Sequence, residues 1–376
     1  MNIIDRCWRR HPNWSSNRQR LAKCSVGFAG KMLRNRGREL TWYTVTDPGD
    51  DPPNPRPGTL RYGATMLRGK VWITFQRDMQ IKLLQPLIVK SSTTIDGRGA
   101  DVHIAHGAGF LIYKVKNVII HGLQFHHIHP QPACLTRDPE GSLVNLGADG
   151  DAIRIAASRK IWIDHNSVYE CQDGLMDVTL GSTAITISNN WFRDHDKVML
   201  LGHDDGFSLD KNMKVTVAFN RFGPNCNQRM PRIRHGYAHV VNNVYDGWGE
   251  YAIGGSMNAS VLSEGNLFIA SEKKKVSQCN LRTLSWRFMF LVGCVDGNGH
   301  GIFQATLRMP GKGANAWNWR SENDGFNNGA FFKEVGVVKA RPGYRKHRSV
   351  PVGNVGEVRS LTRYAGALHC LVGSLC

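Results

Sequence analysis

Short apolar segments that end in a polar turn recur through the middle of the chain. Five of them are six residues long, rich in β-branched residues and end in asparagine, at 161–166, 185–190, 215–220, 238–243 and 261–266. The terminal asparagines are therefore 24, 30, 23 and 23 residues apart. Residues 92–97 and 117–122 repeat the pattern with glycine at the end, and the 44 residues from Gly122 to Asn166 correspond to about two periods. A fixed spacing of about 22 to 25 residues indicates a repeat architecture.

A second strand-like run occurs in each period, at residues 151–155, 177–180, 197–201, 229–233 and 251–253. No helical periodicity separates these runs, which excludes βαβ units, and the leucine spacing of leucine-rich repeats is missing. The sequence therefore predicts an all-β fold, a right-handed single-stranded parallel β-helix in which each coil stacks on the last. The repeated asparagines would form a ladder of side-chain amides at one turn.

The repeat also predicts how the chain is divided. Residues 46–270 form the expected β-helix core. Residues 1–45 precede it as an N-terminal capping segment, in which Trp14–Cys24 is predicted to form a short amphipathic helix over the open end. Residues 271–316 show no period, which suggests an atypical insertion or a disordered loop. Residues 317–376 are expected to pack on the β-helix as a C-terminal segment.

The charge balance narrows the choice of partner. The chain has 48 Lys plus Arg against 30 Asp plus Glu, a net charge of +18, which favours nucleic acid, an anionic membrane surface or an acidic polysaccharide. The longest apolar run, residues 288–295, is far shorter than the roughly 18 residues of a membrane helix, so no membrane span is expected. None of the nucleic-acid recognition motifs is present, so only the net charge favours nucleic acid as the partner.

Four of the nine cysteines lie near the two ends of the chain. Cys7 with Cys24 and Cys370 with Cys376 suggest disulfide staples, and no Cys-x-x-Cys pair points to a metal. Disulfides indicate an oxidising compartment. The first residues lack the basic start and apolar stretch of a secretory signal, so we expect a signal that was trimmed or a chain that is incomplete.

Four aspartates at one edge of the second set of strands suggest a metal site. In-register stacking places equivalent residues of neighbouring coils about 4.8 Å apart. Counting back from each terminal asparagine places the four at or beside a single edge: Asp149, Asp151, Asp173 and Asp177. Carboxylates with no interleaved His or Cys favour a hard cation, Ca²⁺, over zinc or copper. The alternative is that these are ordinary turn aspartates exposed to solvent.

Basic residues continue the same column. Lys197 and Arg229 fall at the equivalent offset once the loop insertion at 204–210 is removed, and Arg234 follows closely. Pro231 cannot donate a ladder hydrogen bond, which indicates a local functional geometry or else an irregular strand edge. Carboxylates followed by lysine and arginine form a groove suited to an anionic chain that a cation bridges to the protein.

Arg229 and Arg234 belong to one of several longer motifs that resemble a known family. The motifs are Ile-Asp-Gly-Arg-Gly at 95–99, Trp-Ile-Asp-His at 162–165, Ile-Thr-Ile-Ser-Asn-Asn at 185–190, Val-Met-Leu-Leu-Gly-His at 198–203 and Arg-Met-Pro-Arg-Ile-Arg at 229–234. Together they resemble plant pectate lyases of polysaccharide lyase family 1, including the related pollen allergens. The resemblance covers roughly residues 2–270, returns at 317–322 and ends in the tail from Gly366. Residues 276–312 depart from the family pattern.

The resemblance implies a function for each candidate residue. Asp149, Asp151, Asp173 and Asp177 match the family's calcium ligands, Arg229 its catalytic base, and Lys197 and Arg234 its contacts to substrate carboxylates. The implied protein is a secreted, monomeric enzyme of the cell wall that cleaves polygalacturonate by β-elimination. Because a guanidinium loses its proton only at strongly alkaline pH, an arginine base predicts an alkaline activity optimum.

Two other functions remain open from the sequence. A β-helix that binds polyanions without catalysis, such as a lectin or an inactive allergen, would keep the basic face. A polygalacturonase would hydrolyse the same polymer with a pair of carboxylates. Two further patterns are better explained structurally: the histidines at 126, 127 and 129 lack a partnering carboxylate in sequence, and the Asp164-His165 pair lacks a serine nucleophile.

Overall fold

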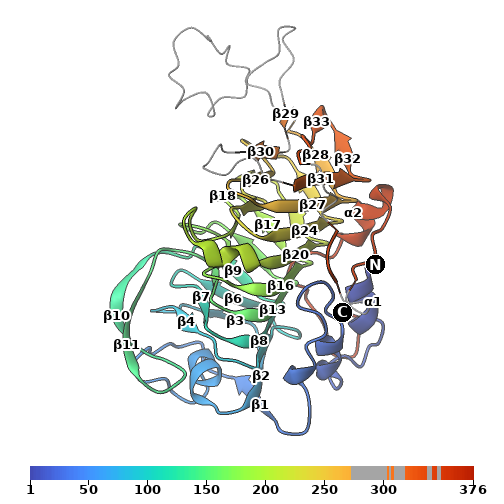
Figure 1. The fold of residues 1–376 in the computed structure, drawn as a ribbon. Coiled ribbons are helices and arrows are strands. Elements are labelled where there is room, and N and C mark those ends of the chain that lie inside the picture. The colour runs from blue at the N-terminus through green and yellow to red at the C-terminus, as the bar shows by residue number, and fades with distance from the viewer. Residues whose placement is uncertain (272–302, 305, 309–317, 337–340, 345–348) are drawn as a thin grey trace.

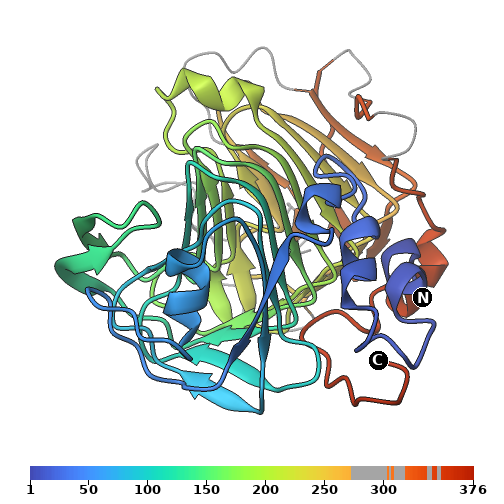
Figure 2. The ribbon, with the colours of Figure 1, turned by 90° about the horizontal axis from the view of Figure 1, so that it is seen from below.

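The computed structural model describes residues 1–271, 303–304, 306–308, 318–336, 341–344 and 349–376. In this part of the chain the strands wind into three long sheets, and the strands within each sheet pair in parallel (Figure 1; Figure 2). Successive strands of the chain pass from the first sheet to the third and then to the second before the next coil begins. The predicted parallel β-helix is confirmed.

The first sheet contains β1 (Leu40–Val45), β2 (Lys70–Phe75), β5 (Thr93–Asp96), β8 (Lys116–His121), β13 (Arg159–Asp164), β16 (Thr183–Ser188), β20 (Lys214–Ala218), β24 (Tyr237–Val241), β27 (Ser260–Glu264) and β31 (Asn318–Glu322). The second contains β4 (Leu87–Ile88), β7 (Phe110–Tyr113), β12 (Ile153–Ala156), β15 (Met176–Thr179), β19 (Met199–Leu201), β23 (Arg232–Ile233), β26 (Ile253–Gly255) and β30 (Thr306–Arg308). The third contains β3 (Met79–Ile81), β6 (Val102–Ala105), β9 (Gln124–His126), β14 (Ser167–Tyr169), β17 (Trp191–Arg193), β21 (Arg221–Phe222), β25 (Val244–Asp246), β28 (Leu267–Ile269) and β32 (Gly325–Asn327).

Most strands of the first sheet are buried on both faces: their inward side chains are apolar, whereas their outward ones include buried polar residues such as Thr186 and His239. In β13, Ile161 and Ile163 point into the β-helix, where they lie in register with Ile185 and Ile187 of β16. Trp162 points the other way and is equally buried, because it packs with residues from the N-terminal segment. The strands of the first sheet therefore hold the β-helix and the segments outside it together.

The repeated asparagines form the predicted ladder at the turn between the first and third sheets. Each side-chain Nδ2 donates to the Oδ1 of the asparagine in the next coil, from Asn166 through to Asn266, over 2.9–3.1 Å. The same Oδ1 atoms also accept from the backbone N–H of the preceding coil's asparagine. Each buried amide thus has partners in the neighbouring coil, which fixes the register of the stack.

The chain between Gly122 and Asn166 corrects the assumption of two periods. Strand β8 pairs directly with β13, so these 44 residues make one coil. The extra length is an antiparallel hairpin of β10 (Gln131–Arg137) and β11 (Leu143–Ala148), which projects from the stack (Figure 1). Periodicity alone could not separate an inserted hairpin from a missing repeat.

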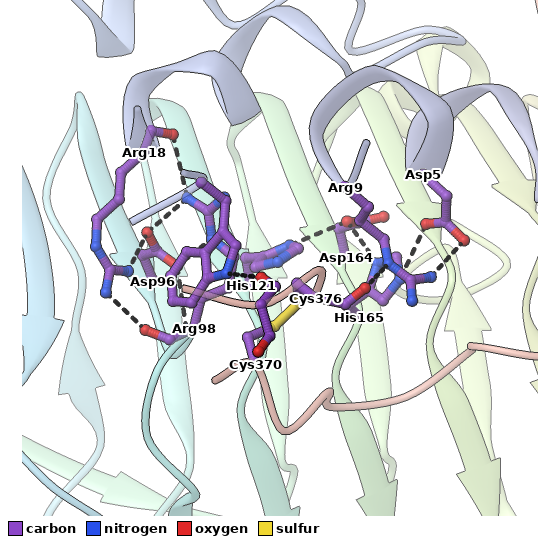
Figure 3. Close-up of a disulfide and its surroundings, with 12 residues drawn as sticks. Asp5, Arg9, Arg18, Asp96, Arg98, His121, Asp164, His165, Cys370 and Cys376 are labelled. Atoms are coloured by element: carbon purple, nitrogen blue, oxygen red, sulfur yellow. Dashed lines mark hydrogen bonds and ion pairs between the residues drawn. A yellow bond between two sulfur atoms is a disulfide. The ribbon is translucent and has the colours of Figure 1, made fainter. Parts of the chain in front are cut away.

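The N-terminal segment lies beside the stack, and the expectation that it covers the open end is wrong. Its helix is α1 (Ile3–Trp8), and Trp14–Cys24 holds the 3₁₀-helix η1 (Arg18–Lys23). Polar contacts dock the segment on the outer face of the first sheet, including His165 Nε2 to Asp5 Oδ1 at 3.1 Å and Arg18 to Asp96 at 2.9 Å (Figure 3). A further 3₁₀-helix, η2 (Leu33–Asn35), packs near β2 and β8.

The start of the stack is instead packed by the short π-helix η3 (Tyr62–Met66). Its Ala64 belongs to the interior core, and the helix contacts β2 and β4, which belong to the first coil. Strand β1 also belongs to the stack, so the β-helix begins at Leu40, before the expected boundary at residue 46.

The β-helix also extends beyond Ala270, where the sequence pattern fades. Strands β30, β31 and β32 pair in parallel with β26, β27 and β28 and add another coil. Phe326 stacks on Phe268 with ring centroids 5.4 Å apart, continuing a row of Phe192, Phe222 and Tyr245. Two short strands pair beside this coil, β29 (Phe303–Gln304) with β33 (Ala330–Phe331). Most of the expected insertion at 271–316 lies outside the described residues.

Both predicted disulfides are present, Cys7–Cys24 and Cys370–Cys376. The second one closes a tail that lies against the N-terminal segment, where Arg9 Nε donates to the carbonyl of Cys376 at 2.8 Å (Figure 3). Helix α2 (Val358–Leu361) and η7 (Val355–Glu357) precede this tail. None of the helices in the described part of the chain has the length and apolar character that crossing a bilayer would take.

Candidate active site

The predicted acidic residues gather where the chain enters the second sheet. Asp149 and Asp151 follow β11 and lead into β12, with Gly150 between them in a left-handed conformation, φ +107°. Asp149 is exposed and lies 3.3 Å from Arg154 through its Oδ2, whereas Asp151 is 7% exposed. The Asp-Gly-Asp sequence thus places one carboxylate outside and one inside the same turn.

The next coil adds Asp173 and Asp177 to this group. Asp173 lies on the turn before β15 and Asp177 lies within the strand. Between them, the backbone N–H of Gly174 donates to Asp151 Oδ1 over 2.9 Å. A Cβ atom at Gly174 would lie 2.5 Å from Asp177 Oδ1 and 2.9 Å from Asp151 Oδ1, so the two carboxylates converge on a space that only glycine leaves open.

The convergence has a clear electrostatic effect. Burial and the neighbouring charges of Asp177, Asp149 and Asp173 raise the pKa of Asp151 well above its usual range. Burial and Asp173 also raise the pKa of Asp177, while Arg154 and Arg229 oppose that rise. A cation held among these oxygens would remove the repulsion. The donor set fits Ca²⁺, which takes carboxylate oxygens in flexible geometry.

The basic residues follow in the next two coils. Lys197 ends the short strand β18 (His195–Lys197), and its Nζ lies 3.9 Å from Asp173 Oδ1. Strand β18 pairs with β22 (Cys226–Gln228), which aligns Lys197 with Gln228, whereas Leu200 aligns with Arg232. Two residues separate Lys197 from Leu200, whereas three separate Gln228 from Arg232. The later coil therefore carries one extra residue, which forms a β-bulge. Arg229 follows Gln228 in a left-handed conformation, φ +62°.

Arg234 closes the basic end of the site. Its Nη1 donates to the carbonyl of Gly202 at 2.9 Å, and its Nε lies 3.5 Å from Asp205 Oδ1. Burial and the nearby Arg232 lower the pKa of Arg234, with Arg229 adding to the same effect. Gly202, at φ +116°, leaves the space that this side chain occupies, because a Cβ there would approach Arg234 Cβ to 2.9 Å.

Comparisons with known proteins decide the family. A family model described as pectate lyase matches residues 77–285, which include every candidate site residue. The chain is 45% identical over 376 residues to probable pectate lyase 4 of Arabidopsis thaliana, covering 100% of this chain and 91% of that relative. It is 46% identical over 381 residues to pectate lyase 1 of Chamaecyparis obtusa, covering 100% and 94%.

The chain belongs to the pectate lyase family. A solved structure agrees: the crystal structure of jun a 1, the major allergen from cedar pollen, matches with a TM-score of 0.87 at 44% identity. That match covers 98% of this chain and 100% of the allergen chain. The family resemblance drawn from the sequence motifs is confirmed.

The register of the pectate lyase stack corrects one detail of the predicted column. The prediction placed Asp177 on the same edge of the sheet as Asp151, but Asp177 aligns with Arg154 and Leu200, in the strand itself. The turn of Asp173 and Gly174 takes up the difference, and Asp177 reaches the site because its carboxylate points back towards Gly174. Counting from the asparagines missed this, since turn lengths vary between coils.

Three further residues of this pectate lyase border the site and were not singled out from the sequence. Arg154 pairs with Asp149, and Arg232 is partly exposed on β23. Tyr251 lies beside Arg229 and Arg232, and burial raises its pKa while the two arginines oppose that rise. The alternation of apolar and charged residues in β12 and β23 would have identified both arginines as outward-facing.

A cavity of about 260 Å³ opens beside the acidic end of the site. Its lining includes Leu111 and Tyr113 from β7, Leu146 from β11, and the charged residues Asp149 and Arg154. The hairpin therefore supplies one wall and the second sheet another. An extended polymer in the groove would meet apolar surface directly next to the carboxylates.

The two patterns that the sequence explained structurally lie elsewhere. The rings of His165 and His121 both contact Asp164 Oδ2, at 2.9 and 3.0 Å, within the buried docking surface of the N-terminal segment (Figure 3). Their ligand atoms lie within 4.8 Å of one another, but Trp8 covers both rings. The histidines at 126 and 127 lie on the third sheet, away from the groove on the second sheet.

Proposed function

We propose that this pectate lyase cleaves polygalacturonate by calcium-dependent β-elimination, leaving a 4,5-unsaturated uronate at the new non-reducing end. The observation that carries the proposal is the convergence of Asp151 and Asp177 on Gly174, with Arg229 close enough to oppose the rise in the pKa of Asp177. Carboxylates and arginine thus lie close together, as an anionic substrate that is held through a cation requires.

Four carboxylates would hold the calcium: Asp149, Asp151, Asp173 and Asp177. Bound Ca²⁺ supplies positive charge that neutralises a substrate carboxylate and so acidifies the adjacent C5–H. Lys197 contributes a second positive charge from the next coil, where it already lies 3.9 Å from Asp173. Arg234, held by Gly202 and Asp205, is placed to contact a further uronate carboxylate of the same polymer chain.

Arg229 is the proposed base. It accepts the proton from C5, the electron pair left on C5 forms the C4–C5 double bond, and the bond from C4 to the glycosidic oxygen breaks. That oxygen leaves with a proton taken from solvent. A guanidine accepts a proton only in its neutral form, which alkaline pH favours, so the reaction should be faster at alkaline pH.

The bulge explains how Arg229 reaches this position. An inserted residue re-aims its side chain relative to the regular column, and bulges next to active sites commonly serve this purpose. The two disulfides agree with secretion into an oxidising compartment such as the cell wall. We propose that the enzyme acts there as a monomer.

The test is the chemistry of the product formed from polygalacturonate. Elimination gives an unsaturated uronate that absorbs in the ultraviolet, and it gives one such group for each new reducing end. The proposal expects this one-to-one ratio, dependence on added Ca²⁺ and a faster reaction at pH 9 than at pH 6. Reducing ends without ultraviolet absorbance would indicate hydrolysis, and binding without product would indicate a non-catalytic polyanion-binding protein.

A further inference from the structure

A larger cavity, of about 820 Å³, lies between the hairpin of β10 and β11 and the first strands of the second sheet (Figure 1). Its lining comes from the hairpin, from β4 and β7, and from the end of η3. Three of its lining residues also line the 260 Å³ cavity beside the acidic site, namely Leu111, Tyr113 and Leu146. The two cavities therefore adjoin, and the space beside the acidic site continues beneath the hairpin.

A row of outward-facing side chains leads from the acidic site to this cavity. In register, the row consists of Asp177 on β15, Arg154 on β12, Leu111 on β7 and Ile88 on β4. Neighbouring strands are about 4.8 Å apart, so the three steps of the row span about 14 Å. Lys90 follows two residues after Ile88. Because Leu87 and Val89 belong to the interior core, the side chain of Lys90 lies on the outer face.

Lys90 is a buried cation without a partner for its charge. The residue is 9% exposed and lines the cavity. In the described part of the chain, no hydrogen bond or ion pair joins its Nζ to another residue. Burial lowers the pKa of Lys90 to about 8, which is the direction expected for an ammonium that no anion compensates. Buried charges in proteins are ordinarily paired, so the cavity offers a place for an anion.

The carboxylates that line the cavity do not meet this need. Asp138 is held in the hairpin turn, where its Oδ1 accepts from the backbone N–H groups of Glu140 and Ser142 at 3.1 and 2.7 Å. Glu140 is exposed on the same turn. On the opposite wall, Lys114 adds a further positive charge, with its Nζ 4.9 Å from the centroid of the Tyr113 ring. The buried wall of the cavity is therefore cationic.

A uronate residue of the polymer has the chemistry that this place requires. Its carboxylate would pair with the Lys90 ammonium in a charge-assisted hydrogen bond. Its sugar ring would pack on the apolar side chains of Ile88 and Leu111. Each uronate lengthens the polymer by about the distance between two coils, so a chain that leaves the acidic site along the row passes one coil with each residue.

We propose that Lys90 binds a carboxylate of the same polyuronate chain that occupies the acidic site, and so forms a distal subsite beneath the hairpin. This inference rests on the proposed function, because it takes the polymer as substrate. A methyl ester carries no charge, so the subsite selects an unesterified uronate at this position.

Initial rates with a long and a short substrate test the proposal. A trimer of galacturonate is too short to reach Lys90 from Arg229, because β23 and β4 are separated by five strand spacings in the second sheet. At pH 7.5 and saturating Ca²⁺, Lys90→Met should raise the KM for polygalacturonate at least about tenfold with little change in kcat. Both constants for the trimer should stay at the parent's values.

Lys116→Met is the matched control, because it removes the same charge from an exposed lysine on the first sheet. It should leave the KM for the polymer in place. Thermal melts show whether the variants fold, and Lys90→Gln takes the place of Lys90→Met if the latter does not. An unchanged KM for polygalacturonate overturns the proposal. A rise that the trimer or Lys116→Met shares equally also overturns it, because a distal carboxylate contact predicts neither.

A binding measurement separates this inference from the proposed function. In an Arg229→Lys background, calorimetric titration with polygalacturonate should give at least about tenfold weaker binding when Lys90→Met is added. This readout needs no cleavage. A parent that forms no unsaturated product contradicts the lyase proposal, whereas equal affinity with and without Lys90→Met contradicts the distal subsite.

Discussion

Asp151 and Asp177 come from successive coils, yet their Oδ1 atoms lie so near Gly174 that a Cβ there would be within 2.9 and 2.5 Å of them. Gly174→Ala should therefore displace one or both carboxylates. Calcium affinity, measured calorimetrically, is expected to fall at least about tenfold, because ligand number and placement set the affinity of such sites.

A matched control separates this effect from the cost of the added methyl group. A Cβ at Gly343 would have no neighbour within 4 Å, so Gly343→Ala should bind Ca²⁺ as the parent does. Unaltered calcium affinity in Gly174→Ala would show that the ion does not bind between these two carboxylates.

The charge of Asp177 gives a second test of the same site. Asp177→Asn keeps the size of the side chain but removes one negative charge, so half-maximal activity should need at least about ten times more Ca²⁺. The measurement is initial rate against calcium concentration. Asp246→Asn, which changes a carboxylate paired with Arg221 on the third sheet, is the control and should leave the curve in place. Full activity in a chelator would remove the metal from the reaction.

The last rung of the asparagine ladder is an aspartate. Asp324 Oδ1 accepts from Asn266 Nδ2 at 3.1 Å, the hydrogen bond that an asparagine Oδ1 accepts in the earlier coils. Burial raises the pKa of Asp324 to about 6. The folded protein thus keeps this proton to about pH 6, while the unfolded chain loses it near pH 4. The contribution of Asp324 to stability falls as pH rises between these values and stays low above them.

Asp324→Asn should therefore stabilise the protein by about 1–2 kcal/mol at pH 7.5 and have almost no effect at pH 4. Urea unfolding at the two pH values measures the difference. Equal effects at both values would show that the carboxylate is not the source of the change.

Docking of the N-terminal segment should weaken at alkaline pH. Burial would lower the pKa of His165, but the carboxylates of Asp164 and Asp5 outweigh it and raise that pKa to about 9. A raised histidine pKa adds stability that is complete below about pH 6.5 and is lost as pH rises through about 9. The free energy of unfolding should fall by about 2–3 kcal/mol across this range.

Asp5→Asn should remove much of this pH dependence, because it takes away one of the two charges that hold the proton on His165. Asp47→Asn is the control, since the Asp47 carboxylate pairs with Arg56 at 3.9 Å and accepts from the backbone N–H of Gly49, not from His165. Unfolding curves at pH 6.5 and 9.5 that shift equally in the parent and in Asp5→Asn would contradict a charged His165.

The sequence predicted the β-helix well because stacking demands a fixed period and the asparagine ladder marks it. Asn166 and Asn190 lie 24 residues apart and are directly hydrogen-bonded. Structural features that depend on a shift of one or two residues in the strand register could not be predicted from the period. The register of Asp177 and the bulge at Arg229 each depend on a few residues within a turn, and periodicity averages over such changes.

Contacts between distant segments were equally beyond the sequence. Asp5 meets His165 only because the N-terminal segment runs back along the first sheet. The contact between His103 Nδ1 and His126 Nε2 at 2.9 Å requires two coils to stack, although the pair at 126 and 127 was visible in the sequence. The nearby carboxylates that the sequence appeared to lack, Asp101 and Glu170, come from neighbouring coils.

The role of Arg229 is the centre of the account, and Arg229→Lys tests it most directly. Lysine keeps the positive charge, so pectate binding should change little, because binding is spread over Lys197, Arg234 and the carboxylates. The measurement is the rate of unsaturated product from polygalacturonate at saturating Ca²⁺, compared with Arg221→Lys on the third sheet as control. The account predicts a loss of at least about 100-fold in Arg229→Lys alone. A rate near that of the parent would contradict an arginine base.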